Sequence, residues 1–227
     1  MISWAAVCLI GLGLGWVVAR FSGAYIASIA AGDSPDVSTF WRAALSLINA
    51  QPFQHRQLWL IMVVQTLCCV WFYRQGGGAA QFFALTAGTA LLQALACIDA
   101  RTGLLPNTLT YPFLALGLLL ALAGVGVGFW PALLGAVGGY VFLWLASSAF
   151  RVVTGQVGIG RGDLKLFAGL GAWVGLAGLW FLLLMACLMG VGFAMWRQRS
   201  VYPRGNYPFG PFLAMAGIGT LLMVMAA

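Results

Sequence analysis

Long uninterrupted runs of apolar residues are the feature that most limits the possible folds of this chain. The runs occupy residues 2–19, 58–73, 79–98, 108–128, 131–150, 164–178, 179–196 and 209–226, and many reach the ~20 residues that a membrane-spanning helix needs. Only 7% of the residues are charged, against about 25% in soluble domains, so polar groups cannot cover a globular surface. The runs do not alternate with polar residues as barrel strands do. The sequence therefore predicts an all-α, polytopic membrane protein with about eight transmembrane helices.

The boundary between the sixth and seventh runs is the least marked one. Only Gly175-Leu176-Ala177-Gly178 separates them, so one long kinked helix is an alternative to two spans. That alternative gives seven spans and moves the C-terminus to the other side of the membrane.

The basic residues predict the orientation. With eight spans, Arg74 alone falls on one side, and the other ten fall together: Arg20, Arg42, Arg56, Arg101, Arg151, Arg161, Lys165, Arg197, Arg199 and Arg204. Because cytoplasmic loops carry an excess of Lys and Arg, the ten-residue side is expected to be cytoplasmic and both termini to face the periplasmic or outer side. The net charge of +7 then reflects topology and anionic lipid headgroups, and nucleic acid is not an expected partner.

Several kinds of site find no support in the sequence. All five cysteines lie in apolar segments without a C-x-x-C pair, and His55 is the only histidine. Zinc ligation, a disulfide framework and a Ser-His-Asp triad are therefore not expected. We expect neither a metal nor a cofactor.

The acidic residues are few: four aspartates and no glutamate. Asp33 and Asp36 lie in a loop expected over residues 32–57 and fit solvated turn or helix-cap positions. Asp99 and Asp163 instead lie where apolar segments meet the predicted cytoplasmic side, where a carboxylate is costly unless it has a partner or a function. They are 163 − 99 = 64 residues apart with two spans between them, so both reach the same face of the membrane.

Two kinds of role fit this pair of aspartates. Carboxylates held close together share a proton, so one can act as general base on a water while the other polarises or protonates a carbonyl. The glycines at 158, 160 and 162 would leave the backbone open to an extended substrate. Alternatively, ion pairs with the neighbouring Arg101, Arg161 or Lys165, or a proton relay, account for the same spacing.

Three stretches bear on this choice: 97-CIDARTGLLPNTLTYP-112, 158-GIGRGDLKLFAGLGAWVG-175 and 207-YPFGPFLAMAG-217. In this order they resemble the motifs of the prepilin peptidase (type IV leader peptidase) family, a group of GxGD-type intramembrane aspartyl proteases, over about residues 85 to 226. The resemblance implies that Asp99 and Asp163 are the catalytic pair. It further implies that the substrate-binding side is formed by Gly160, Gly162, Lys165, Pro208, Phe209 and Gly210. Asn107 stands where many relatives have aspartate, and we expect no proton-transfer role for it.

The resemblance also implies a function. The chain is expected to be a membrane aspartyl endopeptidase of the bacterial inner membrane. It would remove the short basic leader from type IV prepilins or type II secretion pseudopilins on the cytoplasmic side. A small proton- or ion-coupled carrier is the alternative, but it predicts internal repeats and acids nearer mid-membrane, and neither is evident.

One departure concerns the methyltransferase activity of bifunctional relatives. These relatives carry a cytoplasmic domain with paired C-x-x-C motifs after the first span, whereas the loop here has about 26 residues and no cysteine. An accompanying N-methyltransferase activity is therefore doubtful. We expect N-terminal spans over 1–78, with the short loop, and a peptidase membrane core over 79–227.

Overall fold

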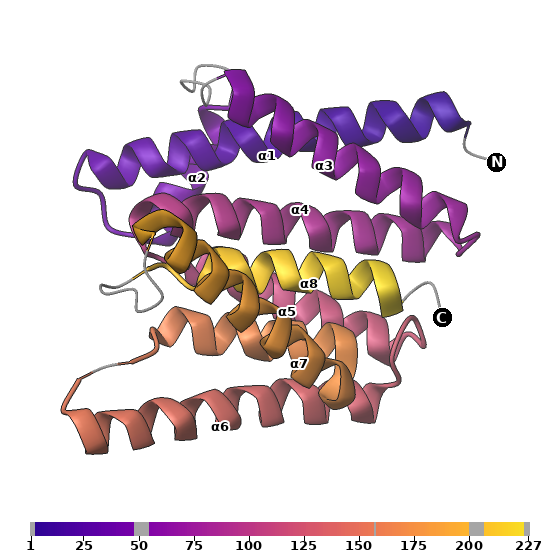
Figure 1. Cartoon of the computed structure of the whole chain (residues 1–227). Helices are drawn as coiled ribbons and strands as arrows, with labels where there is room; N and C mark the ends of the chain where they lie inside the picture. Colours follow the sequence, from indigo (N-terminus) through magenta and orange to yellow (C-terminus); the bar gives the residue numbers. More distant parts are fainter. Residues whose placement is uncertain (1–2, 48–54, 157, 200–206, 225–227) are drawn as a thin grey trace.

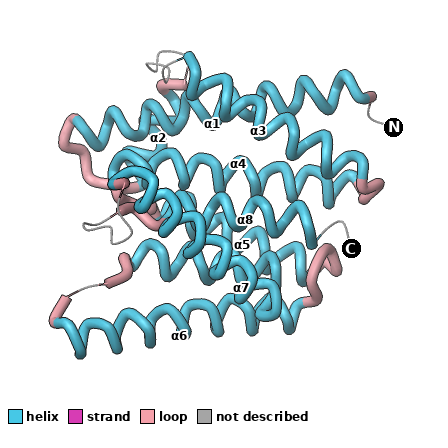
Figure 2. The backbone as a smooth tube through the Cα atoms, viewed as in Figure 1, coloured by secondary structure: helices cyan, strands magenta, loops and turns pink. Residues whose placement is uncertain are grey.

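The fold is a bundle of α-helices (Figure 1), here described from a computed structural model. The structure describes residues 3–47, 55–156, 158–199 and 207–224, and within these ranges Figure 2 shows helices and loops but no strand. The helices are α1 (Trp4–Ala30), α2 (Val37–Leu45), α3 (His55–Arg74), α4 (Ala79–Thr102), α5 (Asn107–Leu122), α6 (Phe129–Thr154), α7 (Arg161–Gln198) and α8 (Gly210–Val224). The predicted all-α class is confirmed.

Helix α1 extends well beyond the apolar run over residues 2–19, so the predicted end of the first span is wrong. It continues through Arg20 to Ala30. The guanidinium carbon of Arg20 lies 5.2 Å from the centre of the Trp16 ring. Arginine is a good helix former, so the helix continues through it, whereas a reading of apolar runs stops at the charge.

Helix α2 was not expected, because the segment 32–57 was predicted to be a loop. Thr39 and Ala43, one turn apart, are buried on the face that packs against α1. Asp36 occupies the N-cap position, and Asp33 forms a salt bridge of 2.9 Å with Arg42. The two aspartates therefore have the cap and turn roles predicted for them. Nine residues are too few for a span, which explains why a search for long apolar runs missed this helix.

Helix α7 reverses its direction at Gly175, within the Gly175–Gly178 stretch where a break was predicted. Gly175 has φ 70° and ψ 175°, a conformation essentially restricted to glycine. A Cβ atom at Gly139 of α6 would lie 3.1 Å from Cδ1 of Leu179 and 3.3 Å from the carbonyl oxygen of Phe167. Residues twelve apart in α7 thus meet the same point of α6, so the two arms, 161–174 and 176–198, run back alongside each other (Figure 1).

Within the described residues, five helices are long and apolar enough to cross a membrane: α1, α3, α4, α6 and α7, the last of which contains both arms. The helices α5 and α8 are apolar but shorter, with 16 and 15 residues. Their lengths of about 24 and 22 Å fall below the ~30 Å hydrocarbon core of a bilayer. A polytopic membrane protein is thus supported, while the count of eight spans stays a prediction.

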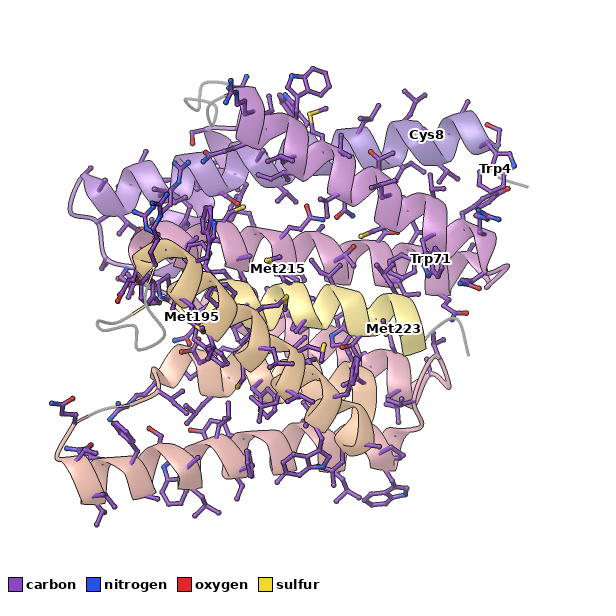
Figure 3. The ribbon with its side chains drawn as sticks, viewed as in Figure 1. Trp4, Cys8, Trp71, Met195, Met215 and Met223 are labelled. Carbon is purple, nitrogen blue, oxygen red and sulfur yellow. The ribbon has the colours of Figure 1, made fainter. Side chains whose placement is uncertain are left out.

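One end of the bundle holds the start of α1 and the end of α8, and Figure 3 shows Trp4, Trp71 and Met223 there, far from Met195. Trp4 packs edge-on against Tyr73 with ring centres 4.6 Å apart, and the indole N–H of Trp71 donates to the carbonyl oxygen of Leu222 at 2.9 Å. The opposite end holds the C-terminal turns of α4 and α6 and both ends of α7.

Glycines set the distance between α6 and α7. A Cβ atom at Gly135 would lie 2.3 Å from the carbonyl oxygen of Gly171, and a Cβ atom at Gly171 would lie 2.2 Å from that of Gly135. The two backbones therefore touch directly, as small residues permit in membrane proteins. This contact fixes the first arm of α7, which carries Asp163, against α6.

We expect Gly171→Ala to lower the free energy of unfolding by about 1–3 kcal/mol, because the added methyl group forces two backbones apart. The measurement is thermal unfolding of the detergent-purified protein, followed by circular dichroism. Gly192→Ala in the same helix is the matched control, since nothing lies within 4 Å of a Cβ atom there. An equal response of the two variants would contradict the backbone contact.

Candidate active site

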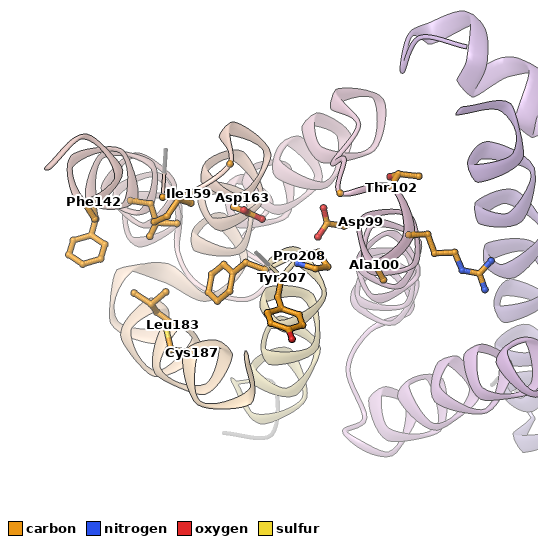
Figure 4. Close-up of a pocket in the computed structure, with 17 residues that line it drawn as sticks. Asp99, Ala100, Thr102, Phe142, Ile159, Asp163, Leu183, Cys187, Tyr207 and Pro208 are labelled. Atoms are coloured by element: carbon orange, nitrogen blue, oxygen red, sulfur yellow. The ribbon is translucent and has the colours of Figure 1, made fainter. Parts of the chain in front are cut away.

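A cavity of about 1080 Å³ opens at the end of the bundle where α4 ends and α7 begins (Figure 4). Its lining combines two carboxylates, the polar residues Arg101 and Thr102 at the end of α4, backbone of a glycine-containing loop and apolar side chains. The lining residues that matter for the argument are Asp99, Gly160, Asp163, Phe142, Leu183 and Phe209.

Asp99 lies in the last turn of α4 and is only 4% exposed. Gly103, with φ 65°, provides the left-handed residue that ends this helix. A negative charge near a helix C-terminus is unfavourable, by roughly 0.3–1 kcal/mol at exposed sites. Oδ2 of Asp99 is buried and makes no hydrogen bond to any described residue. The dipole of α4 therefore opposes a charge at Asp99, whereas the backbone N–H of Gly210, at the start of α8, favours one.

Asp163 lies in the first turn of α7, after the N-cap residue Gly160. A carboxylate is favourable there, because the helix N-terminus carries a partial positive charge. The side chain is half-buried and faces the same cavity as Asp99, and the charges of the two carboxylates interact (Figure 4). The structure thus brings together the two aspartates that the sequence predicted to meet.

Asp163 is recessed within the bundle although it stands at a helix end. Gly139 of α6 meets Phe167 and Leu179 of the two α7 arms at one depth in the bundle. One helical turn closer to the basic end, the same three segments present Leu143, Asp163 and Leu183, and all three line the cavity. From there α6 continues for 154 − 143 = 11 residues and the second arm of α7 for 198 − 183 = 15. At 1.5 Å per residue, these remaining helical segments are about 16 and 22 Å long.

Glycines allow close packing around both carboxylates. A Cβ atom at Gly210, the first residue of α8, would lie 2.6 Å from Oδ2 of Asp99. A Cβ atom at Gly160 would lie 3.3 Å from Oδ2 of Asp163, and a Cβ atom at Gly162 would lie 2.8 Å from Cβ of Leu105. Of the three predicted substrate-binding glycines, Gly160 therefore lines the cavity, while Gly162 and Gly210 pack behind the aspartates.

The basic residues near the aspartates have other partners. Nζ of Lys165 donates to Oδ1 of Asn107 at 2.8 Å and lies 5.2 Å from the centre of the Tyr111 ring. Nη2 of Arg101 donates to Oε1 of Gln57. Neither aspartate forms a salt bridge with a described residue, so the geometry does not bear out the ion-pair alternative. Lys165, predicted to bind substrate, instead joins the beginnings of α5 and α7.

Residues before α8 close one side of the cavity. Pro208 and Phe209, both predicted from the sequence, line it together with Tyr207. The Tyr207 hydroxyl accepts a hydrogen bond of 2.8 Å from Nε2 of Gln198 at the end of α7. Sequence reasoning missed the lining residues Phe142, Leu183 and Cys187. They carry no distinguishing signal, because an apolar residue in a span is expected to face lipid or a neighbouring helix.

The chemistry available at this site is that of two facing carboxylates. No group of three or more His, Cys, Asp or Glu side chains suited to a metal ion occurs in the described parts of the chain. Paired carboxylates, one protonated and one ionised, can activate water and protonate a leaving group.

The fold and this pair of carboxylates define a polytopic helical membrane protein with a two-aspartate site. The sequence profile of the type IV leader peptidase family matches residues 86–195, so the chain carries a type IV leader peptidase domain that includes both aspartates.

The similar proteins share one name, prepilin leader peptidase/N-methyltransferase. The protein of Burkholderia pseudomallei is 44% identical over 148 residues, which cover 64% of this chain and 47% of the relative. That of Xanthomonas campestris is 40% identical over 162 residues (69% and 55%), and that of Dickeya chrysanthemi is 46% identical over 135 residues (58% and 48%). The chain thus spans about half the length of the curated relatives it matches. No solved structure matches it significantly.

We expect Asp99→Asn to raise the free energy of unfolding by about 0.3–1 kcal/mol, because it removes a buried charge from the C-terminal turn of a helix. Thermal unfolding in detergent measures this. Asp33→Asn is the control, because it breaks the salt bridge to Arg42 and should lower stability by up to about 1 kcal/mol. A clear loss of stability in Asp99→Asn would indicate a structural role for this carboxylate.

Proposed function

We propose that this protein is a membrane aspartyl endopeptidase that removes the leader peptide from type IV prepilins or type II secretion pseudopilins. The observation that carries the proposal is the meeting of Asp99 and Asp163 in one cavity, where neither forms a salt bridge with any described residue. The relatives named prepilin leader peptidase support the substrate class. Prepilins or pseudopilins and the lipid bilayer are thus the proposed partners.

In the proposed mechanism the two carboxylates share one proton. The ionised carboxylate accepts a proton from a water molecule, whose oxygen attacks the carbonyl carbon of the scissile peptide bond. The protonated carboxylic acid donates to the carbonyl oxygen, which gives a tetrahedral diol. Collapse of the diol breaks the C–N bond, and the leaving amine takes up a proton from the dyad. Asp99, deeply buried at the end of α4, and Asp163, half-buried at a favourable helix N-terminus, provide two environments that differ enough for these two roles.

The substrate backbone would approach the segment from Gly158 to Gly160. Gly160 is extended, with φ −68° and ψ 145°, and the segment lines the cavity beside Asp163. Gly158 packs against the ring of Phe150, whereas the missing side chain at Gly160 would let an extended peptide lie close to the backbone beside Asp163. Pro208 and Phe209 face the same space from the other side.

The site would face the cytoplasm of a bacterium from its inner membrane. The basic residues at the ends of α4 and α6 and at both ends of α7, such as Arg101, Arg151 and Arg197, share the end of the bundle that holds the cavity, while Arg74 lies at the other. Positively charged ends favour the cytoplasmic side. In this proposal residues 79–227 form the peptidase core and residues 1–78 form additional spans, while methylation of the product by this chain is not part of the proposed activity.

We expect Asp99→Asn and Asp163→Asn each to slow cleavage of a prepilin by at least about 10²-fold, the usual contribution of a general acid or base. Cleavage is measured in membranes at matched expression, and mass spectrometry of the product locates the cut. Asp36→Asn, on the surface helix α2, is the matched carboxylate control and should cleave at the normal rate. Full activity in either dyad variant would exclude that aspartate from catalysis.

We expect Gly210→Ala to reduce cleavage by about tenfold or more, because its methyl group would displace the Asp99 carboxylate, and small misplacements of reacting groups cost up to ~10²-fold. Gly219→Ala in the same helix has nothing within 4 Å of the new methyl group and should cleave normally. The comparison is made by initial rates on one prepilin. Equal rates in the two variants would show that Asp99 tolerates displacement.

A further inference from the structure

The cavity has an open side between α6 and the second arm of α7. The two helices touch where the Phe142 and Trp180 rings stack edge-on with centres 4.9 Å apart. Nearer the basic end, they instead become two walls of the cavity: Phe142, Leu143 and Ala146 from α6, and Leu183 and Cys187 from α7.

Small or apolar residues line both walls of this opening. Ala146 and Cys187 are small and exposed, and they face the cavity from opposite helices. Their sequence neighbours Leu145 and Leu188 are 54% and 57% exposed but do not line the cavity. The opening is therefore apolar along its walls, which suits a lipid-facing entrance better than an aqueous channel.

The inner end of the same space has the opposite character. It holds Asp99 and Asp163, which have no salt-bridge partner among the described residues, and the backbone of Gly158 and Gly160. Asp99 and Asp163 line the same cavity as Ala146 and Cys187, so the apolar entrance leads to the carboxylates. An occupant that matches both ends has an apolar helix in the entrance and a polar or cationic extended segment at the carboxylates.

We infer that the apolar helix of the substrate enters sideways from the membrane, between α6 and the second arm of α7, and docks against Ala146 and Cys187. This inference rests on the proposed peptidase function and adds the surface that selects the substrate. The negative, unpaired dyad complements the cationic end of such a substrate, and the helix in the entrance places the junction next to Asp163. A bilayer lipid with no role in selection is the competing occupant.

Bulky residues in the entrance test the inference. Two substrates are compared: a full prepilin with its apolar helix, and a soluble peptide that contains the leader and the scissile junction but ends before the helix. We expect Ala146→Trp and Cys187→Trp to lower the ratio of cleavage rates, full substrate over short peptide, by about tenfold, which corresponds to about 1.4 kcal/mol. Leu145→Trp and Leu188→Trp, which add the same side chain just outside the cavity lining, should leave this ratio unchanged.

The possible outcomes distinguish a failure of lateral docking from a failure of the proposed peptidase function. An unchanged ratio in both entrance variants, or equal loss on both substrates, overturns lateral docking and leaves a lipid-filled opening. If the Leu145→Trp and Leu188→Trp controls lowered the ratio too, lateral docking would be overturned, because the effect would then not be specific to residues that line the entrance. Failure of the unaltered protein to cleave either substrate refutes the proposed peptidase function itself.

Discussion

The reversal of α7 at Gly175 is the constraint on which the site depends. A straight helix of 38 residues would be about 57 Å long, far beyond a bilayer core of ~30 Å, and would separate its two ends. The backbone conformation of Gly175 instead folds the second arm back beside the first. Asp163 at the start of α7 and Leu183 and Cys187 on the return arm can line one cavity only because of this reversal.

The two aspartates are not equivalent, although each is a carboxylate at a helix end. The N-terminal turn of α7 favours a negative charge at Asp163, whereas the C-terminal turn of α4 opposes one at Asp99. Asp99 is also the more deeply buried of the two. Burial and the dipole of α4 disfavour the charge of Asp99, and only the backbone N–H of Gly210 at the start of α8 is known to favour it among the described residues. A carboxylate kept in such a place is typical of a functional site.

Much of this arrangement could be predicted from the sequence, and the failures share a physical cause. Apolar runs locate helices well but stop at Arg20, although arginine is a good helix former and α1 continues to Ala30. They also miss the nine-residue helix α2. The meeting of Asp99 and Asp163 follows from counting two passes between them. The cavity walls at Phe142, Leu183 and Cys187 could not be found, because a lipid-facing side chain and a cavity-facing one look alike in a sequence.

The partners of Lys165 and Arg101 explain how the two carboxylates remain unpaired in a chain with an excess of basic residues. Lys165 is held by Asn107 and the ring of Tyr111, and Arg101, which lines the cavity, donates to Gln57, so both cations have partners other than the aspartates. A salt bridge to either aspartate would stabilise the ionised form and prevent the pair from sharing a proton. An Asn at 107 can accept from Lys165 without adding a third negative charge near the dyad. The polar contacts around the site thus preserve the acid–base character that hydrolysis requires.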